Sequence, residues 1–262
     1  MDLHLKGKTV CITGGTAGIG LAAAKSFLAE GANVALCGRS EERLAQALAE
    51  LAPLGGSVFS RAVDAADSAA LRGFIRDSAE RFGALDVLVC NAGCGSGVPL
   101  TKTDKAEWNR VFDLNVCAVW EGVQAALPYL EKQGGCVIVT TSFQAKMPFT
   151  STGIYAVSKA AAESMVQVLA SELAASGIRV VGVRPGMIDT ELNAGLKTAY
   201  GEKALSTTMC LQRMGKPGEI ADTIVLLASE RASYTIGVTV EVSGGKLVVQ
   251  DPGYSYAIRQ SR

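Results

Sequence analysis

The sequence predicts an α/β fold: a single Rossmann-type, doubly wound parallel sheet with helices on both faces. First, 262 residues with 48% hydrophobic and 19% charged side chains suit one large domain. Second, short apolar runs alternate along the chain with longer helical patterns. Third, a glycine-rich turn at residues 13–20 joins the first run to the first helical pattern. Because no repeat or linker interrupts the chain, we expect residues 1–262 to form one domain.

Seven short runs have the continuous apolar character of strands that are buried on both faces of a parallel sheet. They are Thr9–Thr13, Asn33–Cys37, Ser57–Val63, Val87–Cys90, Val137–Thr141, Arg179–Val183 and Thr239–Val242. Right-handed crossovers between such strands place the connecting helices on the two faces of the sheet.

Six stretches between these runs have helical periodicity. They are Ile19–Glu30, Glu41–Leu51, Ser68–Phe82, Lys105–Leu130, Tyr155–Ser176 and Glu219–Ala228. Two segments show no pattern: residues 193–215, which we predict to be a substrate lid or binding loop, and the C-terminal tail, residues 246–262. A long segment between a strand and a helix, such as residues 193–215, usually has a function in binding.

The charge balance argues against several classes of partner. The 25 lysines and arginines equal the 25 aspartates and glutamates, whereas nucleic acids and acidic membranes select for basic surfaces. No apolar run reaches the roughly 18–20 residues of a membrane span, and charges occupy residues 1–8 where a signal peptide would be apolar. We therefore expect a cytoplasmic protein with neither nucleic-acid nor membrane partners.

The single histidine, His4, restricts the chemistry further. A metal site with several imidazoles is excluded, and a Ser–His–Asp hydrolase would depend on a residue close to the terminus. The seven cysteines lack a C-x-x-C pattern and lie mostly within apolar runs, which is typical of buried, reduced thiols. No metal site is predicted.

The glycine-rich turn has the features of a phosphate-binding site. Glycines let backbone N–H groups approach a pyrophosphate, and the following helix offers unpaired donors and the positive end of its dipole. A turn without a ligand is the alternative, but the position directly after the first strand favours a nucleotide. The residues predicted to bind are Gly14, Thr16, Gly18, Ile19 and Gly20.

The spacing T-G-x-x-x-G-x-G resembles that of the classical short-chain dehydrogenase/reductase family, and the resemblance extends over roughly residues 5–245. It implies an NAD(P)-dependent enzyme that acts on CH–OH groups with a small-molecule substrate. Further family motifs follow in the expected order: Asn91-Ala92-Gly93, Asn115, Ser142, Tyr155-x-x-x-Lys159, and Pro185-Gly186 with Thr190.

The resemblance implies a role for each catalytic residue. Tyr155 would be the general acid in ketone reduction and the general base in alcohol oxidation, while Ser142 would hydrogen-bond the substrate oxygen. Lys159 lies on the same helical face as Tyr155, where its charge would lower the pKa of the phenol, and it would hold the nicotinamide ribose. Asn115 would anchor a water in a proton relay. Further cofactor contacts are implied at Asn91, Ala92, Gly93, Tyr155, Lys159, Pro185, Gly186, Ile188 and Thr190.

The end of the second strand favours NADP(H), with NAD(H) as the alternative. Gly38 occupies the position of the family's acidic residue, and the guanidinium of Arg39 suits a 2′-phosphate. Alternatively Arg39 is merely solvated beside Glu41 and Glu42. Asp64 is predicted either at the adenine edge or as a turn cap.

We predict an apolar substrate pocket, although each wall residue could equally serve core or interface packing. Such a pocket suits a hydroxysteroid or another alicyclic ketone. A 3-oxoacyl thioester (acyl carrier protein) reductase is the alternative enzyme, and a non-catalytic dinucleotide-sensing module is a more distant alternative. The resemblance also implies a homotetramer, or else a dimer, and we expect the tail to pack on a neighbouring subunit. The proposed wall residues are Phe143, Met147, Met187 and Leu192.

Three positions depart from the family's pattern. Arg184 precedes Pro185 where many relatives have a small polar residue, and Phe143 follows the serine where relatives often keep a glycine. Ser243 replaces the usual aspartate before Gly244. Arg184 and Phe143 border the predicted pocket, so the identity of the substrate does not follow from the resemblance to the family.

Overall fold

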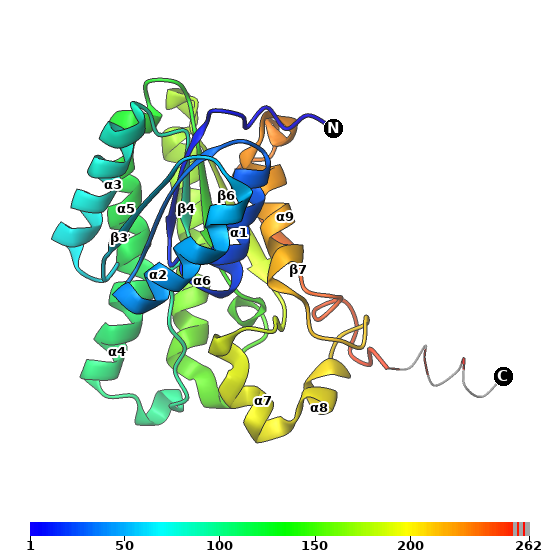
Figure 1. Cartoon of the computed structure of the whole chain (residues 1–262). Helices are drawn as coiled ribbons and strands as arrows, with labels where there is room; N and C mark the ends of the chain where they lie inside the picture. Colours follow the sequence, from blue (N-terminus) through cyan, green and yellow to red (C-terminus); the bar gives the residue numbers. More distant parts are fainter. Residues whose placement is uncertain (254–255, 257–258, 260–262) are drawn as a thin grey trace.

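The computed structural model describes residues 1–253, 256 and 259, and a parallel seven-stranded sheet forms its centre (Figure 1). The strand order is β3-β2-β1-β4-β5-β6-β7, so the order reverses between β1 and β4, where doubly wound sheets bind ligands. Every predicted strand is present, with bounds that differ by at most two residues. The strands are β1 (Thr9–Thr13), β2 (Asn33–Gly38), β3 (Val58–Ala62), β4 (Val87–Cys90), β5 (Cys136–Thr140), β6 (Arg179–Pro185) and β7 (Thr239–Val242).

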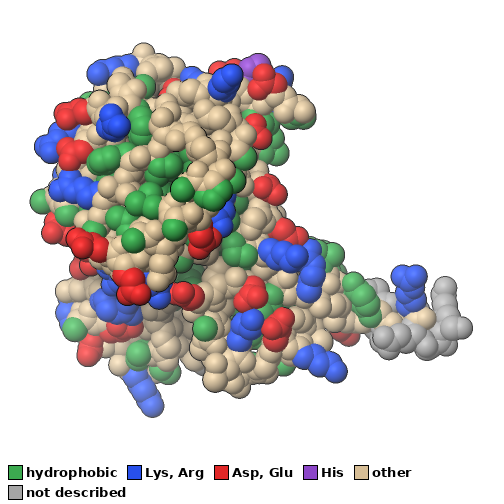
Figure 2. All heavy atoms as spheres, viewed as in Figure 1, with side chains coloured by type: hydrophobic (Ala, Val, Ile, Leu, Met, Phe, Trp, Pro, Cys, Tyr) green, Lys and Arg blue, Asp and Glu red, His purple; other side chains and the backbone are tan. Residues whose placement is uncertain are grey.

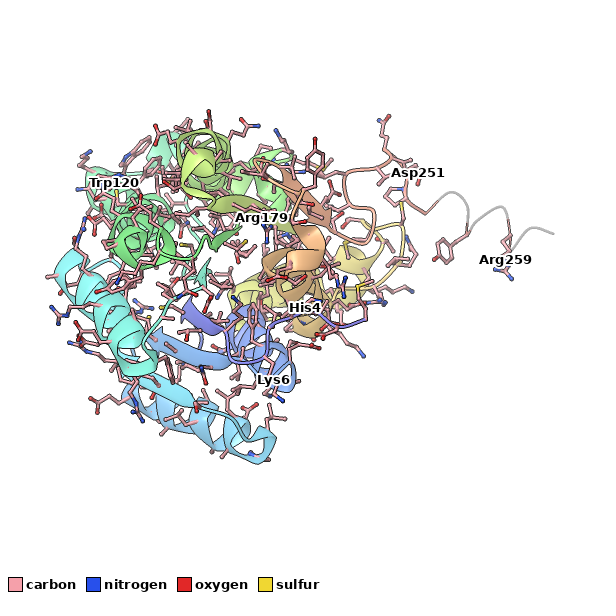
Figure 3. All side chains as sticks on the ribbon, turned by 90° about the horizontal axis from the view of Figure 1, so that it is seen from above. His4, Lys6, Trp120, Arg179, Asp251 and Arg259 are labelled. Carbon is pink, nitrogen blue, oxygen red and sulfur yellow. The ribbon has the colours of Figure 1, made fainter. Side chains whose placement is uncertain are left out.

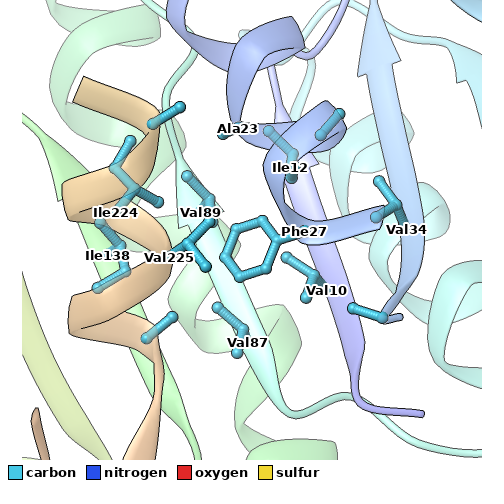
Figure 4. Packing of buried hydrophobic residues seen from close by; sticks show 14 of the residues in the cluster. Val10, Ile12, Ala23, Phe27, Val34, Val87, Val89, Ile138, Ile224 and Val225 are labelled. Atoms are coloured by element: carbon cyan, nitrogen blue, oxygen red, sulfur yellow. The ribbon is translucent and has the colours of Figure 1, made fainter. Parts of the chain in front are cut away.

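Three helices cover one face of the sheet: α1 (Gly18–Ala29), α2 (Glu41–Leu51) and α9 (Pro217–Ala228). Phe27 of α1 is fully buried at the centre of this layer, among valines of the sheet and Val225 of α9 (Figure 4). Burial of an aromatic ring of this size contributes about 2–3 kcal/mol. The helix α9 begins at Pro217, two residues before the predicted start, because proline suits the first helical position.

The other face is covered by α3 (Ser68–Phe82), α5 (Ala118–Leu130) and α6 (Gly153–Leu173). The predicted helical stretch Lys105–Leu130 is helical throughout, but it is not one regular α-helix. The segment consists of α4 (Lys105–Phe112), the π-helical turn η3 (Asp113–Cys117) and α5. A π-helical turn inserts an extra residue into a helix and is frequent at functional sites, and here it holds the buried Asn115.

The sequence pattern suggested that the segment 193–215 is irregular. In the structure this segment contains α7 (Ala194–Tyr200) and α8 (Glu202–Ser206). Both helices are too short to show a clear period. They lie beyond the carboxyl ends of the strands (Figure 1). The remaining short helices are η1 (Ala52–Leu54), η2 (Leu100–Lys102), η4 (Phe143–Ala145), η5 (Thr150–Thr152), η6 (Ala174–Ser176), η7 (Glu191–Asn193) and η8 (Glu230–Ala232).

Charged side chains of both signs are interspersed on the surface rather than gathered by sign (Figure 2). Within the described part of the chain, no helix has the combination of length and apolarity that a membrane crossing needs. The predicted packing of the tail on a neighbouring subunit concerns residues 246–262, of which residues 254–255, 257–258 and 260–262 lie outside the described residues. That packing stays a prediction.

Candidate active site

The glycine turn between β1 and α1 fits the diphosphate of a dinucleotide. Gly14 has a φ of +66°, and a Cβ atom there would lie 2.9 Å from the Cα atom of Ala92. A Cβ at Gly20 would lie 2.1 Å from the carbonyl oxygen of Gly14. The first turn of α1 has neither a side-chain cap from Ala17 nor an acidic residue, so its N–H donors remain available to an anion.

The segments after β4 and β6 border the same turn. The carboxamide nitrogen of Asn91 donates to the carbonyl oxygen of Gly14 at 3.0 Å, and the backbone N–H of Ala92 donates to Thr13 Oγ1 at 3.1 Å. After β6, the methyl group of Thr190 lies 3.2 Å from the position of a Cβ at Gly18. Thr190 of the segment after β6 therefore lies beside the turn, whereas contacts of Pro185, Gly186 and Ile188 with a nucleotide stay a prediction.

The end of β2 lies next to the turn as well. A Cβ at Gly38 would lie 2.6 Å from the Thr16 side chain, so only glycine fits there without a shift. Arg39 is exposed and makes no hydrogen bond or ion pair with any other described residue. The Oδ1 atom of Asp64 accepts from the N–H of Ala66 at 3.0 Å. Asp64 thus serves the turn-capping role, whereas its contact with adenine stays a prediction.

Ser142, Tyr155 and Lys159 come together at the carboxyl end of β5. Ser142 directly precedes η4, where its hydroxyl accepts from the N–H of Gln144 at 3.2 Å, and it lies close enough to Tyr155 on α6 to affect the pKa of the phenol. The Nζ atom of Lys159 donates to the carbonyl oxygen of Thr140 at 2.9 Å and lies 5.9 Å from the centroid of the Tyr155 ring. All three side chains are buried. A phenol, a hydroxyl and an ammonium are therefore held in one small volume beside the nucleotide turn.

The expected lowering of the Tyr155 pKa by Lys159 is corrected by the structure. Burial raises the pKa of Tyr155 above its usual range, and the hydrogen bond with Ser142 only partly opposes this effect. Burial also lowers the pKa of Lys159 to about 8. Both shifts favour the uncharged form, because each side chain has been withdrawn from water.

Asn115 is held by three hydrogen bonds. Its Nδ2 atom donates to the carbonyl oxygen of Cys94 at 3.0 Å and to Ser158 Oγ at 2.9 Å, and its Oδ1 atom accepts from the N–H of Cys94 at 2.9 Å. A Cβ at Gly93 would lie 3.1 Å from Asn115 Oδ1 and 3.3 Å from Lys159 Nζ. The carboxamide thus fixes the segment after β4 against α6. Ser158 lies between Tyr155 and Lys159 in the chain, and its bond to Asn115 across 43 residues has no signal in the local sequence pattern.

Arg184 and Ser243, which both depart from the family's pattern, belong to one network of charged and hydroxyl side chains. The Nε atom of Arg184 lies 2.6 Å from an oxygen of Glu163, and its Nη1 atom lies 3.6 Å from an oxygen of Glu241. Ser243 donates its hydroxyl proton to Glu241. Thr141, the residue before Ser142, donates to Glu163 at 3.3 Å. The network therefore joins β6, β7 and α6 behind the end of β5.

The four predicted pocket residues lie in two different environments. Phe143 and Met187 are buried in a cluster with residues at and after the α7–α8 lid, whereas Met147 is 45% exposed and Leu192 is 54% exposed. Leu192 lies beside Gly95, since a Cβ there would be 3.4 Å from Leu192 Cδ1. The short helix η7, which precedes α7, therefore reaches the segment after β4. The cluster consists of Phe143, Met187, Leu205, Met209 and Met214.

The single histidine, His4, contacts two charged side chains. Its Nε2 atom lies 3.0 Å from the guanidinium of Arg231, and its Nδ1 atom lies 3.8 Å from a carboxylate oxygen of Asp2. The described residues contain no group of three histidine, cysteine or acidic side chains that could hold a metal ion. The seven cysteines are free thiols.

Comparison with known proteins agrees with this geometry. A family model described as enoyl-(acyl carrier protein) reductase matches residues 14–246. The chain is 37% identical over 247 residues to the 3alpha-hydroxysteroid dehydrogenase of Mediterraneibacter gnavus, covering 93% of this chain and 98% of that protein. It is 33% identical over 247 residues to the 3-oxoacyl-(acyl-carrier-protein) reductase of Thermotoga maritima, covering 94% and 100%.

A solved structure is also closely similar. The L-sorbose reductase of Gluconobacter frateurii, complexed with NADPH and L-sorbose, superposes with a TM-score of 0.90 at 32% identity. The match covers 95% of this chain and 100% of that chain. At this identity and coverage, the likeness extends beyond the fold to the whole length of the sequence.

Proposed function

Since the chain belongs to the classical short-chain dehydrogenase/reductase family and is an oxidoreductase acting on CH–OH groups, we propose that it interconverts a lipophilic ketone and its secondary alcohol, preferring NADP(H). The observation that carries the proposal is the buried set of Ser142, Tyr155 and Lys159 beside a diphosphate-binding turn. A dinucleotide sensor without catalysis has no need of a positioned proton donor.

In ketone reduction, Tyr155 donates its phenolic proton to the substrate oxygen. The Ser142 hydroxyl donates a hydrogen bond to the same oxygen, where negative charge develops. The high pKa of Tyr155 keeps the phenol protonated before reaction, and the nearby ammonium of Lys159 stabilises the phenolate that forms. A nicotinamide cofactor, when bound, supplies or accepts the hydride.

The proposed role of Asn115 is to anchor a water molecule in the proton relay. Its carboxamide is already committed to Cys94 and Ser158, so its side chain orients the segment after β4. The residues proposed to hold the cofactor are Gly14, Thr16, Gly18, Ile19, Gly20, Arg39, Asp64, Asn91, Ala92, Gly93, Tyr155, Lys159, Pro185, Gly186, Ile188 and Thr190.

The preference for NADP(H) rests on Arg39. Its guanidinium is exposed at the end of β2 and is not committed to any other described residue, so it is free to pair with a 2′-phosphate. Neighbouring Arg43 is different, because its Nη1 atom lies 2.6 Å from a carboxylate oxygen of Glu191. NAD(H) remains the alternative cofactor.

A hydroxysteroid or another alicyclic ketone is the substrate class that we favour. The buried Phe143, Met187 and Met209 beside the lid offer apolar surface, and the relative from M. gnavus acts on a hydroxysteroid. The alternative, a 3-oxoacyl thioester, is supported by the T. maritima relative. A carrier protein would favour free basic residues near the pocket, but Lys146 and Arg110 pair with Glu163 and Glu107.

We also propose a cytoplasmic homotetramer, or else a dimer. The reduced state of the seven cysteines supports a reducing compartment. Trp120 lies at the periphery of the molecule (Figure 3), 46% exposed on α5, and Val168 on α6 is 53% exposed. A paired face of α5 and α6 would cover both side chains.

The proposed function is tested by NADPH oxidation, followed at near-ultraviolet wavelengths, across a ketone panel. The panel contains ketosteroids, alicyclic ketones, acetoacetyl thioesters and simple sugars, with NADH in parallel. Turnover of a ketosteroid or an alicyclic ketone, faster with NADPH, is the expected result. Turnover of the acetoacetyl thioesters alone would favour the alternative enzyme, and tight cofactor binding without any turnover would favour the sensor.

A further inference from the structure

Lys246 is a buried cation close to the segment that joins Ser142 to Tyr155. Only 7% of this residue is exposed, and its Nζ atom lies 5.6 Å from the ring centroid of Phe143 and 5.8 Å from that of Phe149. Phe143 follows Ser142 directly, and Phe149 lies between Ser142 and Tyr155 in the chain. The ammonium is therefore adjacent to the segment that carries the proton-donor set.

The local backbone turns Lys246 into this position. Gly244 and Gly245 have φ values of +63° and +81°, a region that side chains strongly disfavour. The carbonyl oxygen of Gly244 accepts from the N–H of Leu211 at 3.1 Å, and a Cβ at Gly245 would lie 2.7 Å from Cys210. After β7 the chain is thereby held against the segment that follows α8 (Figure 1).

The charge of Lys246 has no protein counter-ion among the described residues. No carboxylate among the described residues lies within 4.0 Å of its Nζ atom, and Glu241, which lies five residues earlier in the chain, pairs with Arg184. The aromatic faces compensate only part of the cost of burying an ammonium. Burial accordingly lowers the pKa of Lys246.

We propose that Lys246 recognises an anionic group on the substrate, so that the enzyme acts on a lipophilic ketone that carries a carboxylate. This inference rests on the proposed function and narrows its substrate class. The apolar cluster around Phe143 and Met187 contacts the hydrocarbon part of such a substrate. The carboxylate forms a charge-assisted hydrogen bond with the ammonium, which removes the cost of the unpaired buried charge.

The test compares free acids with their uncharged counterparts in the full chain with NADPH. The probes are 3-oxo- and 7-oxo-5β-cholanoic acid, each with its methyl ester, and 4-oxocyclohexanecarboxylic acid with its amide. These pairs vary the distance between ketone and carboxylate. We expect the wild type to have a kcat/KM about 10- to 100-fold higher for the acid than for the uncharged form of at least one pair.

Three variants distinguish a loss of anion recognition from a structural effect of the substitution. Lys246→Met, which keeps most of the length of the side chain but removes the charge, should abolish the preference for the acid. The kcat/KM for the uncharged form should change less than about threefold. The melting temperature of this variant should not fall, because an unpaired buried charge is removed. Lys246→Arg should keep part of the preference. Lys105→Met, at an exposed lysine of α4 outside the proposed site, is the matched control and should keep the whole preference.

The proposal is overturned if the wild type has the same kcat/KM for the acid and the uncharged form of every pair. It is also overturned if Lys246→Met lowers kcat/KM equally for both forms. If no ketone is turned over with either cofactor, the proposed function fails instead. Calorimetric titration of the acids into the enzyme with NADPH then decides the anion site separately. Binding that Lys246→Met weakens at least tenfold supports it, and binding that is absent or unchanged rejects it.

Discussion

Tyr155 and Lys159 are both withdrawn from water, and this burial determines how the proton-donor set behaves before a substrate arrives. The phenol keeps its proton because burial raises its pKa. Lys159 keeps its charge only below a pH of about 8. The hydrogen bond from Lys159 to Thr140 shows what positions the ammonium: a backbone carbonyl, not a carboxylate.

Replacement of Tyr155 by phenylalanine tests the proton donor. Tyr155→Phe removes only the hydroxyl, so we expect the rate of ketone reduction to fall by about 10²- to 10⁴-fold while the dissociation constant for NADPH changes little. Steady-state kinetics and fluorescence titration measure the two quantities. A rate close to that of the wild type would contradict the proposed mechanism.

The lowered pKa of Lys159 predicts a dependence of stability on pH. The folded protein releases this proton near pH 8 and the unfolded chain near the ordinary value of 10.5, so between these values the unfolded state binds more protons. The free energy of unfolding of the wild type should therefore rise across this window relative to Lys159→Met. Urea titrations from pH 7 to pH 10 measure the difference, which would stay constant if the pKa were ordinary.

Arg39 predicts the discrimination between the two cofactors. In Arg39→Asp, a carboxylate would repel the 2′-phosphate, so kcat/KM for NADPH should fall at least about 10- to 100-fold while the value for NADH is maintained or rises. Arg81→Asp makes the same change of charge at an exposed residue of α3 and serves as the control. Equal losses with both cofactors would show that Arg39 has no role in selectivity.

Among the secondary-structure elements, the interrupted helix formed by α4, η3 and α5 has the clearest link to the site. A regular α-helix would leave the carboxamide of Asn115 with different neighbours, whereas the π-helical turn presents it to Cys94 and Ser158. The turn thus connects the helix layer with the segment after β4. The short helix η7 is a second such element, because its Leu192 lies beside Gly95.

Removal of the Asn115 carboxamide tests the role of the π-helical turn. Asn115→Ala removes the partner of the Cys94 backbone N–H and carbonyl and the donor to Ser158, so the free energy of unfolding should fall by about 1–3 kcal/mol and the turnover number should fall with it. Urea unfolding and steady-state kinetics measure these effects. The control is Asn109→Ala, an exposed residue of α4 that should change neither. Full stability in Asn115→Ala would contradict this account.

At the scale of the whole molecule, the exposed apolar residues are relevant to the proposed oligomer. Trp120 and Val168 come from helices that pack on the same face of the sheet, and Val248 of the tail is 70% exposed. The proposed pairing of α5 and α6 covers the first two. A tail packed on a neighbouring subunit would cover the third.

A charge placed on α6 tests the proposed assembly. Val168→Asp should convert the oligomer into smaller species, because an isolated carboxylate in an apolar interface is costly. Light scattering coupled to size-exclusion chromatography gives the molar mass. Leu54→Asp, at an exposed residue of η1 on the other side of the sheet, should keep the wild-type mass. A monomeric wild type, or an unchanged mass in Val168→Asp, would reject the α5–α6 interface.

The sequence by itself determined the strands, the topology class and the types of residue at the site. Strands buried on both faces need continuous apolar runs, such as Val87–Cys90, and a diphosphate-binding turn needs glycines where side chains would clash. These requirements are local, so they are visible along the chain. The helical spacing of Tyr155 and Lys159 is visible for the same reason.

The tertiary structure alone decided the environment of these residues. The π-helical turn depends on a partner 43 residues away, Ser158. The raised pKa of Tyr155 depends on how completely the surrounding layers exclude water. Lys246 meets Phe143 only because two left-handed glycines turn the chain back after β7. Burial and charge pairing arise from contacts between distant segments, and no local pattern encodes which of those contacts form.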